Sequence, residues 1–283
     1  MSPNRPTAPA AAAPIALTRT VRFALLPAGA AADPAPAARN GFAGVPCAHG
    51  LRAHHELTLR LAGVPDARTG YLVGIQEIDA LVRAHLVPRL QAMFVASPTP
   101  SEREALVQLG RAAQEHAPAG TRLIHLTWSP SPFVQHLWSP AMPASATLVE
   151  HFEFSASHRL HCPQLSDEEN RRVFGKCNHP NGHGHNYRLA VAVRVPVDAP
   201  APTLGVGALA AIVDAQVLAR MDHKHLNTDC PEFAQRNPSV ENIAAVCHGL
   251  LEPPVRAAGA ELAWVRVWET EKTSAVYPAG GEG

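Results

Sequence analysis

Three histidines in the second half of the chain have the spacing of a metal site. His183 and His185 are two residues apart where a strand is expected to begin, so a period of two places both imidazoles on one face. His158 ends an earlier alternating strand, on the face that carries Phe152 and Phe154, where a hairpin partner could bring it alongside. Three imidazoles would occupy three corners of a Zn²⁺ tetrahedron and leave the fourth open, which is a catalytic arrangement.

Cys177 lies six positions before His183, and three roles fit that spacing. It could be a fourth metal ligand, or a small buried residue of the kind that free cysteines usually are. It could also be a catalytic base or nucleophile whose thiolate is favoured by the adjacent Lys176 and by nearby zinc. Spacing alone leaves all three open.

Two further features could supply acid–base or binding groups. Asp222 and His223 follow a helix expected over about 207–220. A carboxylate beside an imidazole can orient a general acid or base, although a histidine favoured by the helix dipole is the simpler explanation. Glu269 ends the last strand, where an acid usually has no specific role, but it could accept two parallel N–H bonds from a guanidine-like ring edge.

The amino-acid composition limits the partners and the cellular compartment that we expect for this protein. The 24 basic and 24 acidic residues balance, so there is no electrostatic case for a nucleic-acid or membrane partner. No apolar run approaches the roughly 20 residues that span a bilayer. The five cysteines are odd in number and widely spread, which indicates free thiols in a reducing compartment and predicts a cytoplasmic protein. The Ala/Pro-rich residues 1–18 predict a disordered leader.

The chain contains an internal repeat. Four pairs of segments match in the same order: 57–66 with 189–198, 71–90 with 202–221, the block around Ser101 with that around Ser239, and the segment ending at Ser129 with that ending at Glu269. Because the four pairs occur in the same order, and the number of residues between the members of a pair changes only gradually, we predict two copies of one fold. We expect these copies at residues 19–138 and 147–280, joined by a Pro/Ser/Ala-rich linker over 139–146.

Each copy is expected to be an α+β unit. A strand and a long loop lead to a second strand, which is residues 183–197 in the second copy. Helices over 207–220 and 240–251 follow, the latter with Ser239 as N-cap, and a strand closes the copy. We predict a four-stranded antiparallel sheet with two helices. Its open edges predict assembly with other units.

The second copy resembles the 6-pyruvoyl-tetrahydropterin synthase family. The motifs that carry the resemblance are HFEFSASHRL, LSDEENRRVFGKCNHPNGHGHNY, MDHKHLN, PSVENIA and VWET. The resemblance implies the tunnelling fold, in which strands of three units assemble into a barrel. The LSDEEN insertion and the five residues between Cys177 and His183 resemble the pyruvoyl-forming branch, whereas related 6-carboxy-tetrahydropterin synthases of the queuosine pathway have a shorter spacing.

The resemblance also implies residue roles. The implied zinc ligands are His158, His183 and His185. The implied catalytic residues are Cys177, which would abstract protons, and Asp222 and His223, which would come from a neighbouring subunit. The implied substrate-binding residues are Glu269 at the amino-pyrimidine edge of the pterin, with Ser239, Val240, Glu241 and Lys176.

The implied substrate is 7,8-dihydroneopterin triphosphate. Zinc would polarise its side-chain oxygens, Cys177 would move protons along the side chain, and triphosphate would be eliminated. The implied assembly is a homo-oligomer, a trimer or hexamer, with active sites between subunits. A 6-carboxy-tetrahydropterin synthase is one alternative. A non-catalytic pterin- or zinc-binding assembly protein is another, and the complete Cys/Asp/His set argues against it.

The first copy is expected to lack this site and to serve a structural role. The positions that match the second copy's ligands and catalytic residues hold other types: Leu51, Ala53, Gln91, Ala92, and Ser129 or Pro130. A shifted alignment would bring His49, His54 or His55 near one ligand position but never complete the set. We therefore predict no zinc in this copy.

Overall fold

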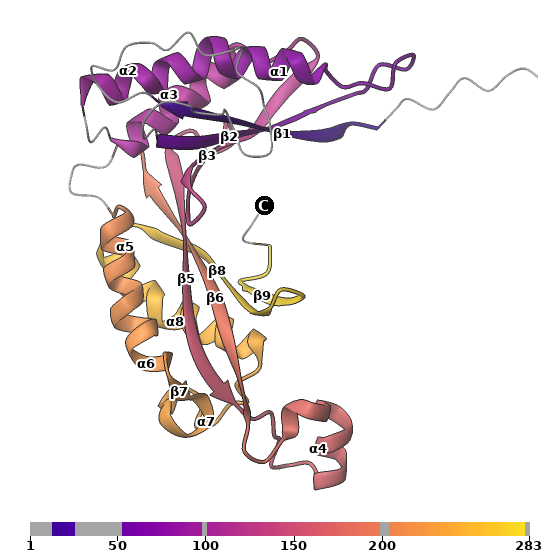
Figure 1. Ribbon diagram of the computed structural model, residues 1–283, viewed down its shortest axis with the longest axis vertical. Coiled ribbons are helices and arrows are strands. Elements are labelled where there is room, and N and C mark those ends of the chain that lie inside the picture. The colour runs from indigo at the N-terminus through magenta and orange to yellow at the C-terminus, as the bar shows by residue number, and fades with distance from the viewer. Residues whose placement is uncertain (1–12, 26–52, 98–100, 199–203, 281–283) are drawn as a thin grey trace, which may run out of the picture. The chain divides into compact units, whose positions relative to one another are not determined.

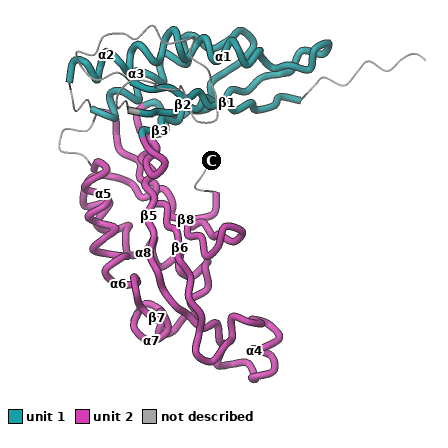
Figure 2. The backbone as a smooth tube through the Cα atoms, viewed as in Figure 1, with its two compact units in different colours: residues 1–130, 137–143 teal, residues 131–136, 144–283 magenta. Residues whose placement is uncertain are grey.

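The protein is described here by a computed structural model that covers residues 13–25, 53–97, 101–198 and 204–280 (Figure 1). It divides into two compact units (Figure 2). Unit 1 comprises Met1–Pro130 and Leu137–Pro143, and unit 2 comprises Ser131–His136 and Ala144–Gly283. Across the described ranges, no helix has both the length and the apolar character needed to cross a bilayer.

The sheet of unit 2 is built from four antiparallel strands in the order β5-β6-β8-β9. Their bounds are β5 Ser145–His158, β6 His183–Pro196, β8 Glu261–Thr270 and β9 Thr273–Tyr277. A two-residue strand, β7 (Lys224–His225), pairs in parallel with the end of β5. Together with its helices, this sheet confirms the α+β class.

Helices cover one face of this sheet (Figure 1). They are α5 (Val206–Val213), the π-helical turn η3 (Asp214–Leu218), α6 (Ala219–Met221) and α8 (Val240–Ala257). The buried core lies between them and the strands, and its largest members include Phe154, Tyr187, Leu189, Leu209, Val217, Met221, Ile243 and Leu251. The odd-numbered residues of β6 between Tyr187 and Val195 all join this core, as a period of two requires.

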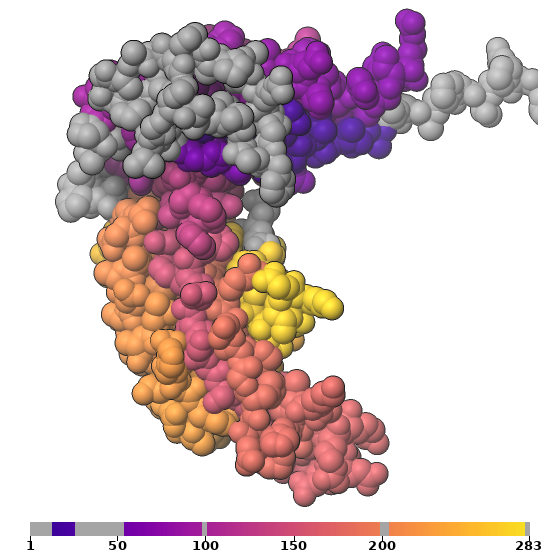
Figure 3. Space-filling model, viewed as in Figure 1, coloured from indigo at the N-terminus to yellow at the C-terminus, as the bar shows by residue number. Residues whose placement is uncertain are grey.

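The loop between β5 and β6 carries its own helix, α4 (Asp167–Phe174), followed by the 3₁₀ turn η2 (Gly175–Asn178). Ser166 and Glu169 cap α4 reciprocally, so the segment Ser-Asp-Glu-Glu signals a helix that the sequence analysis did not predict. The segment forms a lobe at the end of β5 and β6 (Figures 1 and 3). Two short elements, α7 (Leu226–Asp229) and η4 (Pro231–Phe233), complete unit 2.

Unit 1 has the same order of elements. Its antiparallel strands are β1 (Ile15–Leu25), β2 (Ala53–Gly63) and β3 (Thr121–Ser131). Between β2 and β3 lie α1 (Ile75–Leu81), the π-helical turn η1 (Val82–Leu86), α2 (Val87–Ala96) and α3 (Glu102–Glu115). The strand β4 (Val134–Trp138) follows, and its residues are divided between the two units.

Two irregularities recur at matching places in the two units. The pairing of β2 shifts register between Arg60 and Leu61, and that of β6 shifts between Ala192 and Val193, 132 residues later in both cases. The π-helical turns η1 and η3 begin at Val82 and Asp214, which are again 132 residues apart. Bulges and π-turns are local interruptions of regular strands and helices. Their occurrence at equivalent positions of the two units is a structural similarity in addition to the similarity of sequence.

Three boundaries differ from the sequence-based expectation. β1 begins at Ile15, so the leader predicted over 1–18 is too long at its end, while residues 1–12 lie outside the described chain. β5 begins at Ser145, which shortens the linker predicted over 139–146. Helix α8 continues to Ala257 through Pro253 and Pro254. The carbonyl left without a partner by Pro253 belongs to an exposed glycine, where water can take its place.

Candidate metal centre

The pairing of β5 with β6 brings the three predicted histidines together. His158 lies opposite His183, and Ala156 lies opposite His185. Because side chains alternate along both strands, all three imidazoles share the face that carries the core, at the open end of the strand pair. The same alternation adds Tyr187, two residues after His185, to this face.

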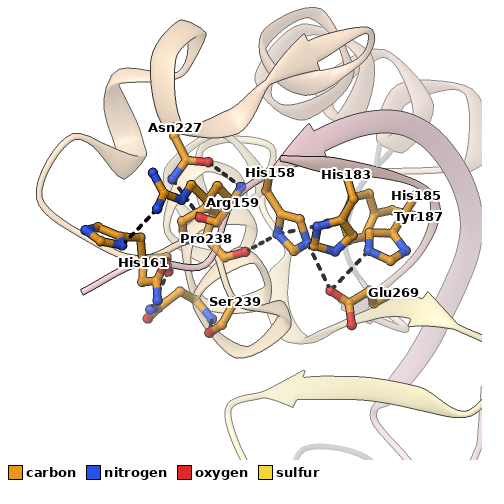
Figure 4. Close-up of polar contacts among 12 residues, drawn as sticks. His158, Arg159, His161, His183, His185, Tyr187, Asn227, Pro238, Ser239 and Glu269 are labelled. Atoms are coloured by element: carbon orange, nitrogen blue, oxygen red, sulfur yellow. Dashed lines mark hydrogen bonds and ion pairs between the residues drawn. The ribbon is translucent and has the colours of Figure 1, made fainter. Parts of the chain in front are cut away.

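The ring nitrogens converge with one carboxylate. His158 Nε2 lies 3.1 Å from His183 Nε2 and 3.3 Å from Glu269 Oε1, and His185 Nε2 lies 3.6 Å from the same oxygen (Figure 4). One ligand atom from each of the four side chains falls within 4.8 Å of the others. No other such group occurs among the residues that the structure describes.

His158 is held in the tautomer that a metal ligand needs. Its Nδ1 lies 2.7 Å from the carbonyl oxygen of Pro238, which can only accept, so Nδ1 carries the proton. The imidazole is fully buried, and burial lowers its pKa to about 4. The ring is therefore neutral near pH 7, with the lone pair of Nε2 aimed into the cluster. A carbonyl behind a ligating histidine is a common supporting contact in metal sites.

The spacing of these atoms fits a tetrahedral ion. Ligands about 2.05 Å from a zinc ion stand about 3.3 Å apart, close to the separations found here. His185 Nε2 is buried and has no hydrogen-bond partner among the described residues, and the same holds for His183 Nδ1. Buried nitrogens without partners are costly, so a cation at the convergence point would satisfy at least the one on His185. The four side chains could hold a metal ion.

Cys177 lies in η2 beside this cluster but outside the four-residue group. Its backbone oxygen accepts a hydrogen bond from the amide of Leu160, two residues beyond His158, which ties η2 to the end of β5. Burial, followed by the charge of Glu269, raises the pKa of the Cys177 thiol. The protein groups around this sulfur thus favour the thiol, so any thiolate needs a nearby positive charge.

Glu269 faces the histidines across the cluster. Its carboxylate is 17% exposed, and one oxygen approaches both His158 and His185. The family resemblance implies substrate recognition alone for Glu269, whereas this position also allows it to ligate a metal. The register of β6 with β8 decides this, because it carries the end of β8 alongside His185.

Asp222 and His223 lie at the edge of the sheet, beside β5. The Asp222 carboxylate accepts a hydrogen bond from the amide of Ser155 and lies 2.9 Å from His223 Nδ1. The bond from Ser155, then the one from His223, lowers the pKa of Asp222. Ser155 points away from the face of His158, and it lines a hollow together with Asn186 and His223. Among the described residues, no hydrogen bond or ion pair joins this pair to the histidine cluster of its own chain.

The remaining predicted residues occupy different environments. Ser239 caps α8 by accepting a hydrogen bond from the amide of Asn242. The side chain of Val240 is buried in the core, so only its backbone could face a substrate. Glu241 and Lys176 are exposed. Spacing did not indicate the contributions of Tyr187 and Pro238, although the period of two in HGHNY identifies Tyr187 in retrospect.

The second half of the chain is similar to known proteins. The family described as 6-pyruvoyl tetrahydropterin synthase matches residues 147–279. The human 6-pyruvoyl tetrahydrobiopterin synthase is 40% identical over 133 residues, which are 47% of this chain and 90% of the human protein. The Poecilia reticulata synthase is 40% identical over 44% of this chain and 84% of its own. A solved structure of the Caenorhabditis elegans 6-pyruvoyl tetrahydropterin synthase is 34% identical, covers 47% of this chain and 94% of its own, and has a TM-score of 0.41.

Proposed function

Because the chain belongs to the 6-pyruvoyl tetrahydropterin synthase family, we propose that unit 2 is a lyase that forms 6-pyruvoyl-tetrahydropterin. Its substrate is 7,8-dihydroneopterin triphosphate, and inorganic triphosphate is the leaving group. The observation that carries this proposal is the convergence of three imidazoles and one carboxylate beside Cys177. A binding protein would need no thiol next to its metal ligands.

The proposed ion is Zn²⁺, held by His158, His183 and His185, because three imidazoles with an open position are typical of catalytic zinc. When bound, the ion supplies Lewis acidity toward the oxygens of the substrate side chain and a positive charge that favours the Cys177 thiolate. The fully buried His158, fixed by Pro238, orients this site before substrate arrives.

Cys177 is the proposed base that removes protons from the side chain of the pterin. Its partners in proton transfer are Asp222 and His223 of a neighbouring subunit. Their position at the edge of β5 supports this assignment, since no hydrogen bond or ion pair among the described residues joins them to their own chain's cluster and they remain open to another's. The hydrogen bonds that lower the pKa of Asp222 keep it ionised beside the imidazole.

Glu269 is the proposed anchor for the amino-pyrimidine edge of the pterin, with Ser239, Val240 and Glu241 nearby and Lys176 at the rim. A carboxylate can accept two parallel N–H bonds from such an edge. Its present approach to the histidine nitrogens is compatible with this role if the carboxylate turns toward the substrate on binding.

Unit 1 is proposed to be a degenerate copy of unit 2. The common order of elements, the matching π-turns and the matching register shifts support this origin. Continuing the register of β2 with β3 aligns Pro130 with Glu269 and His55 with Tyr187, so unit 1 lacks the carboxylate. We propose that it has a structural role in a homo-oligomer whose strands close into barrels.

The test is to incubate the purified protein with 7,8-dihydroneopterin triphosphate and to identify the products by mass spectrometry. We expect 6-pyruvoyl-tetrahydropterin and inorganic triphosphate. Cys177→Ala should lower turnover by at least about a hundredfold, the usual scale for loss of a catalytic base, while metal content and melting temperature stay unchanged. A 6-carboxy product would reassign the reaction, and triphosphate release that survives the substitution would exclude Cys177 as the base.

A further inference from the structure

A second pocket of unit 2 lies directly behind the metal centre. Its volume is about 690 Å³, and it opens between the α4 lobe and the segment that contains α7 and η4. The two sites share a wall. Pro238 holds the ring of His158 on one side, and on the other the neighbouring Asn237 accepts a hydrogen bond from the amide of His161 (Figure 4).

The lining of this pocket carries positive charge without a compensating acid. The guanidinium groups of Arg159 and Arg236 contribute to it, and none of the described residues that line it is aspartate or glutamate. The carboxylates next to it in sequence are engaged elsewhere. Asp229 accepts hydrogen bonds from the amide of His225 and from the hydroxyl of Thr228, and Glu232 pairs with Arg220 at 2.9 Å.

Arg159 and His161 are oriented before any ligand binds. Arg159 donates from Nε to the carbonyl of Asn178 and from Nη2 to His161 Nδ1, both at 3.3 Å. Asn178 Nδ2 donates to the carbonyl of Leu160 at 2.8 Å and lies 3.2 Å from the same imidazole nitrogen. Since both neighbours of His161 Nδ1 are donors, that nitrogen accepts and Nε2 carries the proton. The His161 side chain therefore offers the N–H of Nε2 to a ligand, in addition to the N–H donors of Arg159.

The second guanidinium, that of Arg236, is available to a ligand. The exposed side chain of Arg236 makes no hydrogen bond or ion pair with any part of the chain that the structure describes. The side chains of Asn181 and Asn237 add amide groups to the lining, and Thr228 adds a hydroxyl. A guanidinium, fixed N–H donors and no carboxylate are the features that recognise phosphate oxygens.

We propose that this pocket is a subsite for a polyphosphate chain, with Arg236 and Arg159 as its principal contacts. The inference rests on the proposed function in one respect, that the natural occupant is the triphosphate of the pterin substrate. The subsite lies next to His158 because the adjacent residues Asn237 and Pro238 contact the pocket and the histidine cluster respectively. The subsite holds the leaving group while the pterin lies on the side of Glu269.

The test uses the full-length protein and inorganic tripolyphosphate, with binding measured by calorimetry. Arg236→Gln should weaken binding about five- to tenfold, the loss expected for one charge-assisted contact at a partly open site. Arg256→Gln is the matched control, because it removes one exposed arginine from α8 outside the pocket, and it should change the dissociation constant by less than about twofold. The comparison is repeated after metal removal, since tripolyphosphate itself can chelate a metal ion.

Measurements of turnover distinguish a failure of the subsite proposal from a failure of the proposed function. With 7,8-dihydroneopterin triphosphate, Arg236→Gln should raise KM by a similar factor and leave kcat within about twofold. Normal turnover together with unchanged KM and unchanged tripolyphosphate binding overturns the subsite while the function stands. Tripolyphosphate binding that depends on Arg236 in a protein without pterin turnover supports the subsite and overturns the function.

Discussion

His158 connects most of the chemistry in this protein. One nitrogen is held by the carbonyl of Pro238, and the other points toward His183 and Glu269. Its backbone leads directly to Arg159 and the second pocket. The imidazole is fully buried and neutral, so the Pro238 carbonyl fixes the orientation of this candidate metal ligand.

Glu269 has two possible partners, the metal and the pterin, and a substitution distinguishes them. We expect Glu269→Gln to retain about one metal ion per chain, since three imidazoles suffice for zinc, and to raise KM at least about tenfold through loss of charge-assisted bonds. Metal content by mass spectrometry and steady-state kinetics check this. Loss of metal as complete as in His185→Ala would make Glu269 a ligand instead.

His55 makes the stability of unit 1 depend on pH. The imidazole is 3% exposed and accepts a hydrogen bond from Trp128 Nε1, and burial lowers its pKa to about 4 from 6.5. In the unfolded chain His55 becomes protonated as the pH falls below 6.5, whereas in the folded chain it stays neutral down to about pH 4. Unit 1 should therefore lose stability as pH falls through this window, by on the order of 3 kcal/mol, and change little above it.

Denaturant unfolding followed by tryptophan fluorescence measures this effect. His55→Gln keeps an acceptor for Trp128 but does not titrate, so its stability should fall less between pH 6.5 and 4. The neighbouring His54, which is 49% exposed, provides the control His54→Gln. Equal pH dependence in His55→Gln and the wild type would contradict the assignment.

At the scale of elements, the turn before β6 decides whether the histidines converge. Gly182 has φ +71°, and a Cβ there would lie 2.8 Å from the His158 carbonyl and 2.9 Å from His225 Nε2. Gly184, in the strand itself, would place a Cβ no closer than 3.6 Å to Ala156. The first glycine is required by conformation and space, whereas the second has room for a methyl group.

We expect Gly182→Ala to destabilise the protein by at least about 1 kcal/mol and to lower metal affinity, because it pushes the end of β5 away from β6. Gly184→Ala should have little effect on either. Melting temperature and metal titration on the two variants test the difference. Equal behaviour of the two variants would show that the turn does not position the site.

At the scale of the whole molecule, the separation of Asp222 from the histidine cluster makes a specific prediction about assembly. If each active site combines Cys177 of one chain with Asp222 of another, Cys177→Ala and Asp222→Asn chains complement each other. Mixed oligomers formed by joint refolding should recover about a quarter of wild-type turnover, because random association restores one complete site in four. Each variant refolded alone remains the control.

No recovery in demonstrably mixed oligomers would place both groups in the same chain's site. Light scattering under the same conditions gives the oligomeric state. The metal content of the full-length protein provides an independent check on the repeat, because a degenerate unit 1 predicts one zinc per chain. A value near two would contradict the proposed loss of the site.

The sequence by itself determined the features that depend on local backbone geometry. The period of two placed His183 and His185 on one face, and the capping preference of serine placed the start of α8 after Ser239. The same local signals would have revealed α4, through the capping box that begins at Ser166. Such features follow from neighbours a few residues apart, which the sequence shows directly.

Only the tertiary structure decided which distant groups meet. The carbonyl of Pro238 reaches a histidine 80 residues earlier in the chain, and Glu269 reaches the same ring across the sheet. The position of Asp222 at the edge of the sheet depends on where α6 ends relative to β5. These contacts arise from strand register and helix packing over long loops, and no local pattern of residue types specifies them.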